Sequence, residues 1–185
     1  LHGHVEALVE AGVDAVWYPC MSYNNDEGIG DNHYNCPVVA YYPELLAANV
    51  PALKKTRFLD PYVGLWRHKD CAKRLSALFE TEFGIPKEET KAAVAAAYDA
   101  YNAYVEDIHA TGEKYIEEAR AQGKPIIVMA GRPYHIDPEI NHGINDLITS
   151  FGFVLITEDT LAYREGYETR TVLNQWTFQS RMYNA

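Results

Sequence analysis

The sequence predicts an α/β protein made of parts of two Rossmann-like parallel-sheet units joined by a helical connector. Two observations lead to this prediction. Apolar runs suited to buried strands lie at 13–18 and 126–130, and each has helical patterns beside it. Between these runs, residues 63–123 are dominated by helical spacing. The order strand, helix, strand is typical of parallel sheets.

The first expected domain spans residues 1–62. Apolar residues at helical spacing occupy positions 1–11, and Gly12 is suited to end that helix. A strand at 13–18 follows. Because a helix leads directly into a strand, we expect the βαβ unit to have its first strand before this chain, so that the chain is an internal segment of a larger protein.

The rest of this domain alternates between loop and regular structure. Residues 22–36 are rich in Asn, Asp and Gly and lack periodicity, which predicts a loop. We expect a short apolar strand at 37–42 and then a helix at 43–49. An extended piece at 56–62 ends the domain.

Residues 63–123 are expected to form the helical connector. A first helix is predicted over 65–83, before Gly84. A second helix begins at Pro86 and runs to about Gln122, with apolar and aromatic side chains recurring on one face.

Residues 124–185 are expected to begin a second α/β domain of the flavodoxin or Rossmann type. The run at 126–130 suits a central parallel strand. A helix capped by Asp137 is predicted to extend to about residue 151, and a strand at 153–157 completes the βαβ unit. A further helix is expected at about 172–182.

The net charge limits the classes of partner that the chain can bind. The chain has 16 basic and 26 acidic residues, a net charge of −10. This argues against nucleic acid and anionic membranes as partners. No apolar run is long enough for a membrane span, and no secretory signal opens the chain, so we expect a cytoplasmic protein.

The three cysteines are candidates for chemistry. An odd number favours reduced thiols or metal ligands over a set of disulfides. Cys20 follows a predicted parallel strand, where ligands bind in open sheets, and Cys36 follows the polar loop. No CxxC spacing is present, so ordinary buried thiols are the competing interpretation. Cys71 lies within a predicted helix and is expected to pack there.

The segment from Gly131 to Asp137 is a second candidate site. It leads from a strand into a capped helix, and helix starts attract anions. Arg132 offers a bidentate donor for phosphate or carboxylate, and His135 is the second candidate cofactor-binding residue. No glycine-rich phosphate motif is present, so a purely structural turn stays an open alternative.

Three strings go beyond these general patterns: LHGHV with YPC, then YNCPVVA with YPE, then GRPYHIDPEINHG. Together they resemble the large CoA-substrate-specific activase-related proteins of the 2-hydroxyglutaryl-CoA dehydratase group, over nearly the whole chain. The resemblance implies that Cys20 and Cys36, with a cysteine upstream of this chain, ligate a [4Fe–4S] cluster in the full-length protein. This segment alone is expected to hold no assembled cluster.

The resemblance also implies a function. The chain would be the cluster-bearing, dehydratase-like region of an ATP-dependent, low-potential electron-transfer system, inactive by itself. Its partner would be an ATP-hydrolysing activase domain or subunit, and the candidate substrate is an acyl-CoA. Two alternatives stay open: a docking scaffold without chemistry of its own, and an anion- or CoA-binding α/β domain that uses Arg132.

Overall fold

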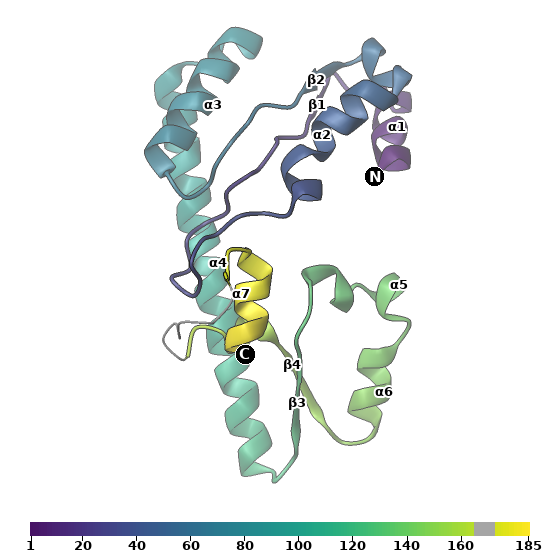
Figure 1. Cartoon of the computed structure of the whole chain (residues 1–185), viewed down its shortest axis with the longest axis vertical. Helices are drawn as coiled ribbons and strands as arrows, with labels where there is room; N and C mark the ends of the chain where they lie inside the picture. The colour runs from purple at the N-terminus through teal and green to yellow at the C-terminus, as the bar shows by residue number, and fades with distance from the viewer. Residues whose placement is uncertain (165–172) are drawn as a thin grey trace. The chain divides into compact units, whose positions relative to one another are not determined.

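The computed structural model describes residues 1–164 and 173–185. It is an α/β structure with two small parallel sheets, as the sequence predicts (Figure 1). The chain divides into two compact units. Unit 1 comprises residues 1–26 and 33–95, and unit 2 comprises 27–32 and 96–185.

Unit 1 contains a complete βαβ arrangement. Strands β1 (Ala15–Trp17) and β2 (Arg57–Leu59) pair in parallel, with Ala15 opposite Arg57. Parallel strands require a crossover connection, and helix α2 (Pro37–Asn49) lies within it. The other elements of this unit are α1 (His2–Glu10), η1 (Pro51–Lys55), α3 (His68–Phe83) and the start of α4 (Lys87–Ala121).

A small apolar core holds the first helices of unit 1 together. Val5 of α1, Leu46 of α2, and Val50 and Leu53 at η1 form one buried cluster. Partly buried side chains pack against it, among them Val9, Tyr18, Tyr42 and Phe58. Leu46 is completely buried, so this core depends on the face that α2 presents to it.

The prediction of a strand at 37–42 is wrong, because helix α2 already begins at Pro37. Cys36 is extended and precedes a proline at the first helical position, where the fixed φ of proline suits a helix. The buried residues of α2 are Ala40, Pro43 and Leu46, a spacing of three that places them on one helical face. Val38 is 59% exposed, so the apolar run does not mark a buried strand.

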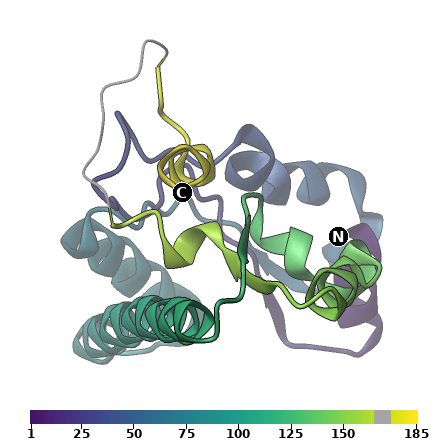
Figure 2. The ribbon, with the colours of Figure 1, turned by 90° about the horizontal axis from the view of Figure 1, so that it is seen from below.

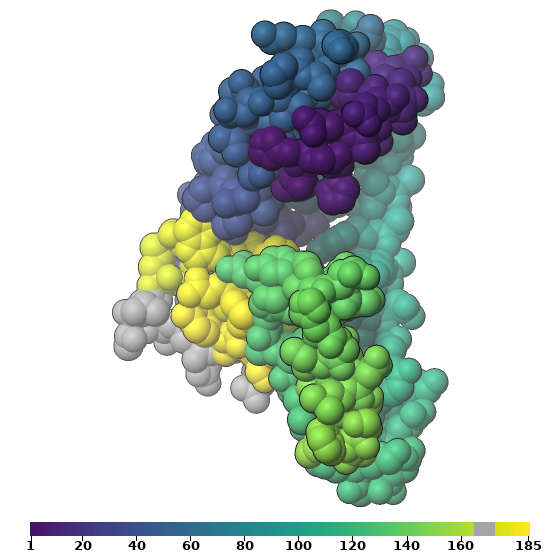
Figure 3. Space-filling model, turned by 90° about the vertical axis from the view of Figure 1, so that its right-hand side faces the viewer, coloured from purple at the N-terminus to yellow at the C-terminus, as the bar shows by residue number. Residues whose placement is uncertain are grey.

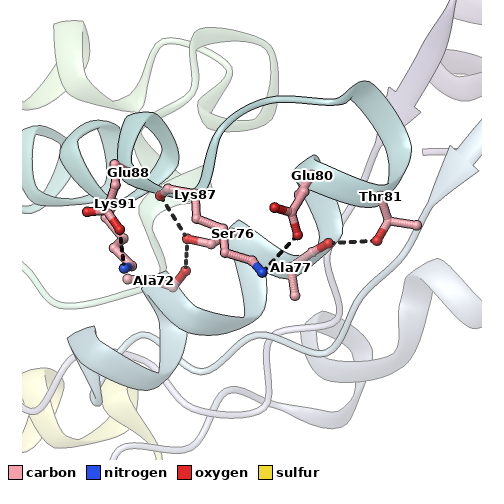
Figure 4. A network of polar contacts seen from close by, with 8 residues as sticks. All are labelled: Ala72, Ser76, Ala77, Glu80, Thr81, Lys87, Glu88 and Lys91. Atoms are coloured by element: carbon pink, nitrogen blue, oxygen red, sulfur yellow. Dashed lines mark hydrogen bonds and ion pairs between the residues drawn. The ribbon is translucent and has the colours of Figure 1, made fainter.

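The two connector helices form as predicted and meet at a polar corner (Figure 4). Helix α3 ends at Gly84, whose φ of 67° is the left-handed conformation that glycine adopts readily. The Ser76 hydroxyl donates to the Ala72 carbonyl at 2.6 Å and lies 3.4 Å from the Lys87 carbonyl. An ion pair of 2.9 Å joins Lys87 to Glu80. These contacts attach the first turn of α4 to α3.

Unit 2 contains the second predicted βαβ unit. Strands β3 (Ile126–Met129) and β4 (Val154–Thr157) pair in parallel, with Ile126 opposite Val154. Between them lie η2 (Pro133–Ile136), α5 (Pro138–Asn141) and α6 (Ile144–Ser150). Figures 1 and 2 show the sheet between α6 and the later part of α4. After β4 come η3 (Glu158–Thr160) and α7 (Thr177–Asn184).

The single helix expected after Asp137 is interrupted. Asp137 caps α5 as predicted, but His142 and Gly143 both have positive φ and separate α5 from α6. The buried Asn141 stabilises this break, because its side-chain oxygen accepts the N–H of Asn145 at 3.0 Å. A non-glycine residue seldom adopts positive φ, so the sequence carries little signal for this interruption.

Helices α5 and α6 lie at the surface (green in Figure 3), and several of their apolar side chains are exposed. Ile140, Ile144, Leu147 and Phe151 are each at least half exposed in this chain. These two helices therefore bury only part of their apolar surface against the β3–β4 sheet.

The end of the chain is tied to residues 27–32 within unit 2. Arg181 of α7 forms a bidentate ion pair with Glu27, with the Nε bond at 2.8 Å. The backbone N–H of the fully buried Asn174 donates to the Asp31 carboxylate at 2.7 Å. A helix was expected at about 172–182; it runs from Thr177, and position 172 lies outside the described residues.

Replacement of Leu46 tests the core of unit 1. Leu46→Ala should lower the free energy of unfolding by about 2–5 kcal/mol, because it leaves a cavity among buried side chains. The neighbouring Leu45 is 48% exposed, so Leu45→Ala should change the free energy of unfolding by less than about 0.5 kcal/mol. Urea unfolding followed by circular dichroism measures both, and equal losses in the two variants would contradict this core.

Candidate functional site

The pairing of unit 1 continues beyond the ends of its two strands. The Cys20 N–H donates to the Pro61 carbonyl at 2.9 Å, and the Val63 N–H donates to the Cys20 carbonyl at 2.9 Å. Cys20 and Tyr62 form a further parallel bridge. Cys20 therefore lies at the carboxyl edge of the β1–β2 sheet, the position where ligands bind in open α/β sheets.

The Cys20 thiol is completely buried beside α2. Burial raises the pKa of this thiol, and the Glu44 backbone N–H opposes that effect by hydrogen bonding to the sulfur. The carboxylates of Glu44 and Asp60 raise the pKa further. At neutral pH the side chain is therefore a protonated thiol, which is a poor nucleophile until a metal or base removes its proton.

Tyr62 links the same sheet edge to α2. Its hydroxyl donates to the Glu44 carboxylate, and this hydrogen bond is the main reason that the pKa of Tyr62 rises to about 12. Glu44 therefore faces both Cys20 and Tyr62, and fixes α2 against the ends of the strands.

The predicted loop at 22–36 folds back on itself and returns the chain to Cys20. Tyr23 and Tyr34 form an antiparallel bridge, and their hydroxyls are 2.8 Å apart. Closer to the sheet, the Asn35 backbone N–H donates to the Ser22 carbonyl at 2.9 Å, and its side-chain amide donates to the Met21 carbonyl at 3.0 Å. Asn35 is itself buried.

This ribbon brings the two predicted cluster ligands into one neighbourhood. Met21 follows Cys20, and Asn35 precedes Cys36, so the Met21–Asn35 bond joins the segments that carry both cysteines. Cys36 is half-buried at the N-cap of α2, whereas the Cys20 thiol packs further along that helix, at Glu44.

Cysteine thiols are in type the ligands that an iron–sulfur cluster takes, and the Met21–Asn35 bond joins the two segments that carry them. Within residues 1–164 and 173–185, no three His, Cys, Asp or Glu side chains come together as a metal site. The other ligands of a cluster would therefore have to come from elsewhere. Cys71 is buried in α3, where the sequence places it as a packing residue.

Arg132 and His135, the candidate cofactor-binding residues, are in contact with each other in unit 2. The His135 Nδ1 accepts the Arg132 backbone N–H at 2.9 Å, so the neutral ring carries its proton on Nε2. A Cβ at Gly131 would lie 2.3 Å from that Nδ1, so glycine is needed beneath the ring. The Arg132 guanidinium lies 5.7 Å from the centre of the Phe178 ring. Ligand binding by these two residues stays a prediction.

Glu158 is a residue that the sequence reasoning missed. It directly follows β4, and its side chain is buried. Burial raises the pKa of its carboxyl group, while backbone N–H groups, including that of Gly131, lower it. The sequence did contain a signal for this residue, because a charged residue immediately after an apolar parallel strand indicates a position at the carboxyl edge of a sheet. Glu158 and Gly131 lie at the carboxyl edge of the β3–β4 sheet.

The raised pKa of Glu158 predicts a pH-dependent stability. A glutamate whose pKa is raised by folding stabilises the folded state fully at pH values below the pKa of an ordinary glutamate. This stabilisation is lost as the pH rises through the raised pKa of the folded state. Glu158→Gln should therefore have a higher melting temperature than the parent at pH 7, and the difference should shrink toward pH 4. Melting followed by circular dichroism measures this, with Glu139→Gln on the exposed start of α5 as control. A constant difference at both pH values would count against the assignment.

The fold and these edges define an α/β protein whose candidate chemistry lies at the carboxyl ends of parallel strands. The chain belongs to the family described as CoA enzyme activase uncharacterised domain, whose model matches residues 1–161. This confirms the activase-related part of the sequence resemblance. No curated protein matches the chain, and no solved structure does. Over the described residues, the helices are too short or too polar to cross a membrane.

Proposed function

We propose that this chain is the cluster-bearing region of a CoA-enzyme activase system related to the 2-hydroxyacyl-CoA dehydratases. In this proposal Cys20 and Cys36 are two thiolate ligands of a [4Fe–4S] cluster, and the remaining ligands come from outside this chain. The observation that supports it most is the Met21–Asn35 hydrogen bond, which joins the segments bearing both cysteines. The family match supports the link to CoA-enzyme activation.

The residues present suit this role in two respects. The Cys20 thiol is shielded from water, and Cys36 is only half-buried at the N-cap of α2, which leaves its thiol accessible to a cluster. When bound, such a cluster supplies a one-electron carrier whose potential depends on burial and hydrogen bonding. Cys20 must lose its proton to act as a ligand, and its raised pKa makes loading weaker as the pH falls.

The proposed partners follow from the same family. An ATP-hydrolysing activase domain or subunit would deliver the electron, and an acyl-CoA would be the class of substrate on which the system acts. The chain's net charge of −10 suits a partner that presents a basic face.

The iron content of the anaerobically purified full-length protein tests the proposal. Near-stoichiometric iron and acid-labile sulfide are expected, and Cys20→Ser and Cys36→Ser should each lower both, because an alcohol replaces a thiolate ligand. Cys71→Ser is the matched control, since Cys71 is buried within α3, and it should retain the parent's iron content. Full iron and sulfide in both the Cys20 and Cys36 variants would overturn the proposal.

A further inference from the structure

One face of the helical crossover in unit 2 is apolar and exposed. Helices α5 and α6 lie on one side of the β3–β4 sheet, and the later part of α4 lies on the other (Figures 1 and 2). From residue 133 to residue 152, only Asn141 is buried. Apart from Ile148, the large apolar side chains of this stretch are 47–71% exposed: Tyr134, Ile136, Ile140, Ile144, Leu147 and Phe151. The last four of these form what we call the α5–α6 face.

The spacing of this face suits a helical partner. Ile144, Leu147 and Phe151 follow one another at intervals of three and four along α6 and its C-cap, so they lie on one side of the helix. They are 50%, 56% and 71% exposed, respectively. An apolar stripe of this kind is the surface on which a second helix packs, with the ridges of one helix in the grooves of the other.

The size of the face suits one helix better than a second copy of this chain. A stable interface between two proteins buries about 800 Å² on each side, from some 20–30 residues. The α5–α6 face offers Ile140 and the stripe of α6, and each of these side chains is already partly covered. A stripe of this length spans about two turns, which a single amphipathic helix can cover.

The charges beside the face favour a basic partner. Residues 133–152 contain Asp137, Glu139 and Asp146, and no lysine or arginine. All three carboxylates are exposed, and within the described part of the chain none of the ion pairs involves Glu139 or Asp146. A second copy of this chain would bring these like charges together, whereas lysine and arginine side chains would be attracted to them.

We propose that the α5–α6 face docks a basic amphipathic helix of a partner protein. The apolar side of that helix packs on Ile144, Leu147 and Phe151, and its lysine or arginine side chains meet Glu139 and Asp146. Docking removes from water the apolar surface that α5 and α6 leave uncovered, and the charges at its border orient the helix.

Binding of two model peptides to the full-length protein tests the face. One peptide has leucine and lysine at helical spacing, which gives it an apolar side and a basic side, and the other has glutamate in place of lysine. Fluorescence anisotropy of the labelled peptides should show saturable binding of the lysine peptide, and binding of the glutamate peptide that is weaker by about tenfold or more. Equal binding of the two peptides, or no saturable binding of the lysine peptide, would overturn the proposal.

Variants locate the bound peptide on α6. Leu147→Asn and Phe151→Asn should each weaken binding of the lysine peptide about tenfold, because each removes apolar area from the stripe. Asp146→Asn should make binding less sensitive to salt, because one attractive charge is lost. Leu45→Asn is the matched control and should bind like the parent, since Leu45 is 48% exposed on α2 in unit 1. Equal affinity in the Leu147, Phe151 and Leu45 variants would show general attraction to an acidic chain and would overturn the assignment.

Two further measurements separate this proposal from its alternatives. The parent and Leu147→Asn should have the same mass by light scattering; a dimer that only Leu147→Asn dissociates would assign the face to a second copy and overturn the proposal. Cys20 and Cys36 belong to unit 1, so Cys20→Ser should bind the lysine peptide like the parent whether or not it holds iron. Circular dichroism establishes that each variant is folded. Loss of peptide binding in a folded Cys20→Ser variant would contradict a site confined to α5 and α6.

Discussion

The parallel pairing of β1 with β2, carried on past the strands through Cys20 and Val63, is the interaction on which the functional edge of unit 1 depends. Parallel strands leave their carboxyl ends at the same edge. One pairing therefore positions two features together: the buried thiol of Cys20 and a pocket in front of α3. A change of register would displace both.

Two different environments result at this edge. Around Cys20 the structure is closed: burial raises the pKa of its thiol, the Glu44 backbone N–H lowers it, and the Glu44 carboxylate accepts a hydrogen bond from Tyr62. Beside it, Arg67 and Arg74 face an open space. Burial keeps the thiol neutral, whereas the guanidinium groups lie at the surface, Arg67 beside Asp70 and Arg74 bonded to the Tyr62 carbonyl. The edge therefore combines a thiol that is shielded from water with a pocket lined by arginine side chains.

The sequence predicts the parallel strands of both units, because the apolar runs ending at Tyr18 and at Ala130 carry a strong local signal. It fails at 37–42, where adjacent valines favour a strand but the position of Pro37 and the core around Leu46 select a helix. The break at His142 was missed because few non-glycine residues adopt its backbone conformation.

Only the part of the candidate site that depends on local sequence could be predicted. Cys20 could be placed at a strand end from its own neighbours in the chain. The pocket joins Tyr23, Tyr62 and Arg74, residues far apart in sequence that meet only after the strands pair. No periodicity reveals such a meeting, because it depends on tertiary contacts that a local pattern does not contain.

Amide hydrogen exchange at Cys20 and Val63 tests the central claim most directly. Both N–H groups donate within the extended pairing, so they should exchange slowly, with protection comparable to that of Tyr18, whose N–H donates to the Leu59 carbonyl at 2.9 Å. Exchange resolved by NMR provides the comparison. Protection at Tyr18 together with rapid exchange at Cys20 and Val63 would mean that the pairing ends with the strands, and the edge described here would not exist.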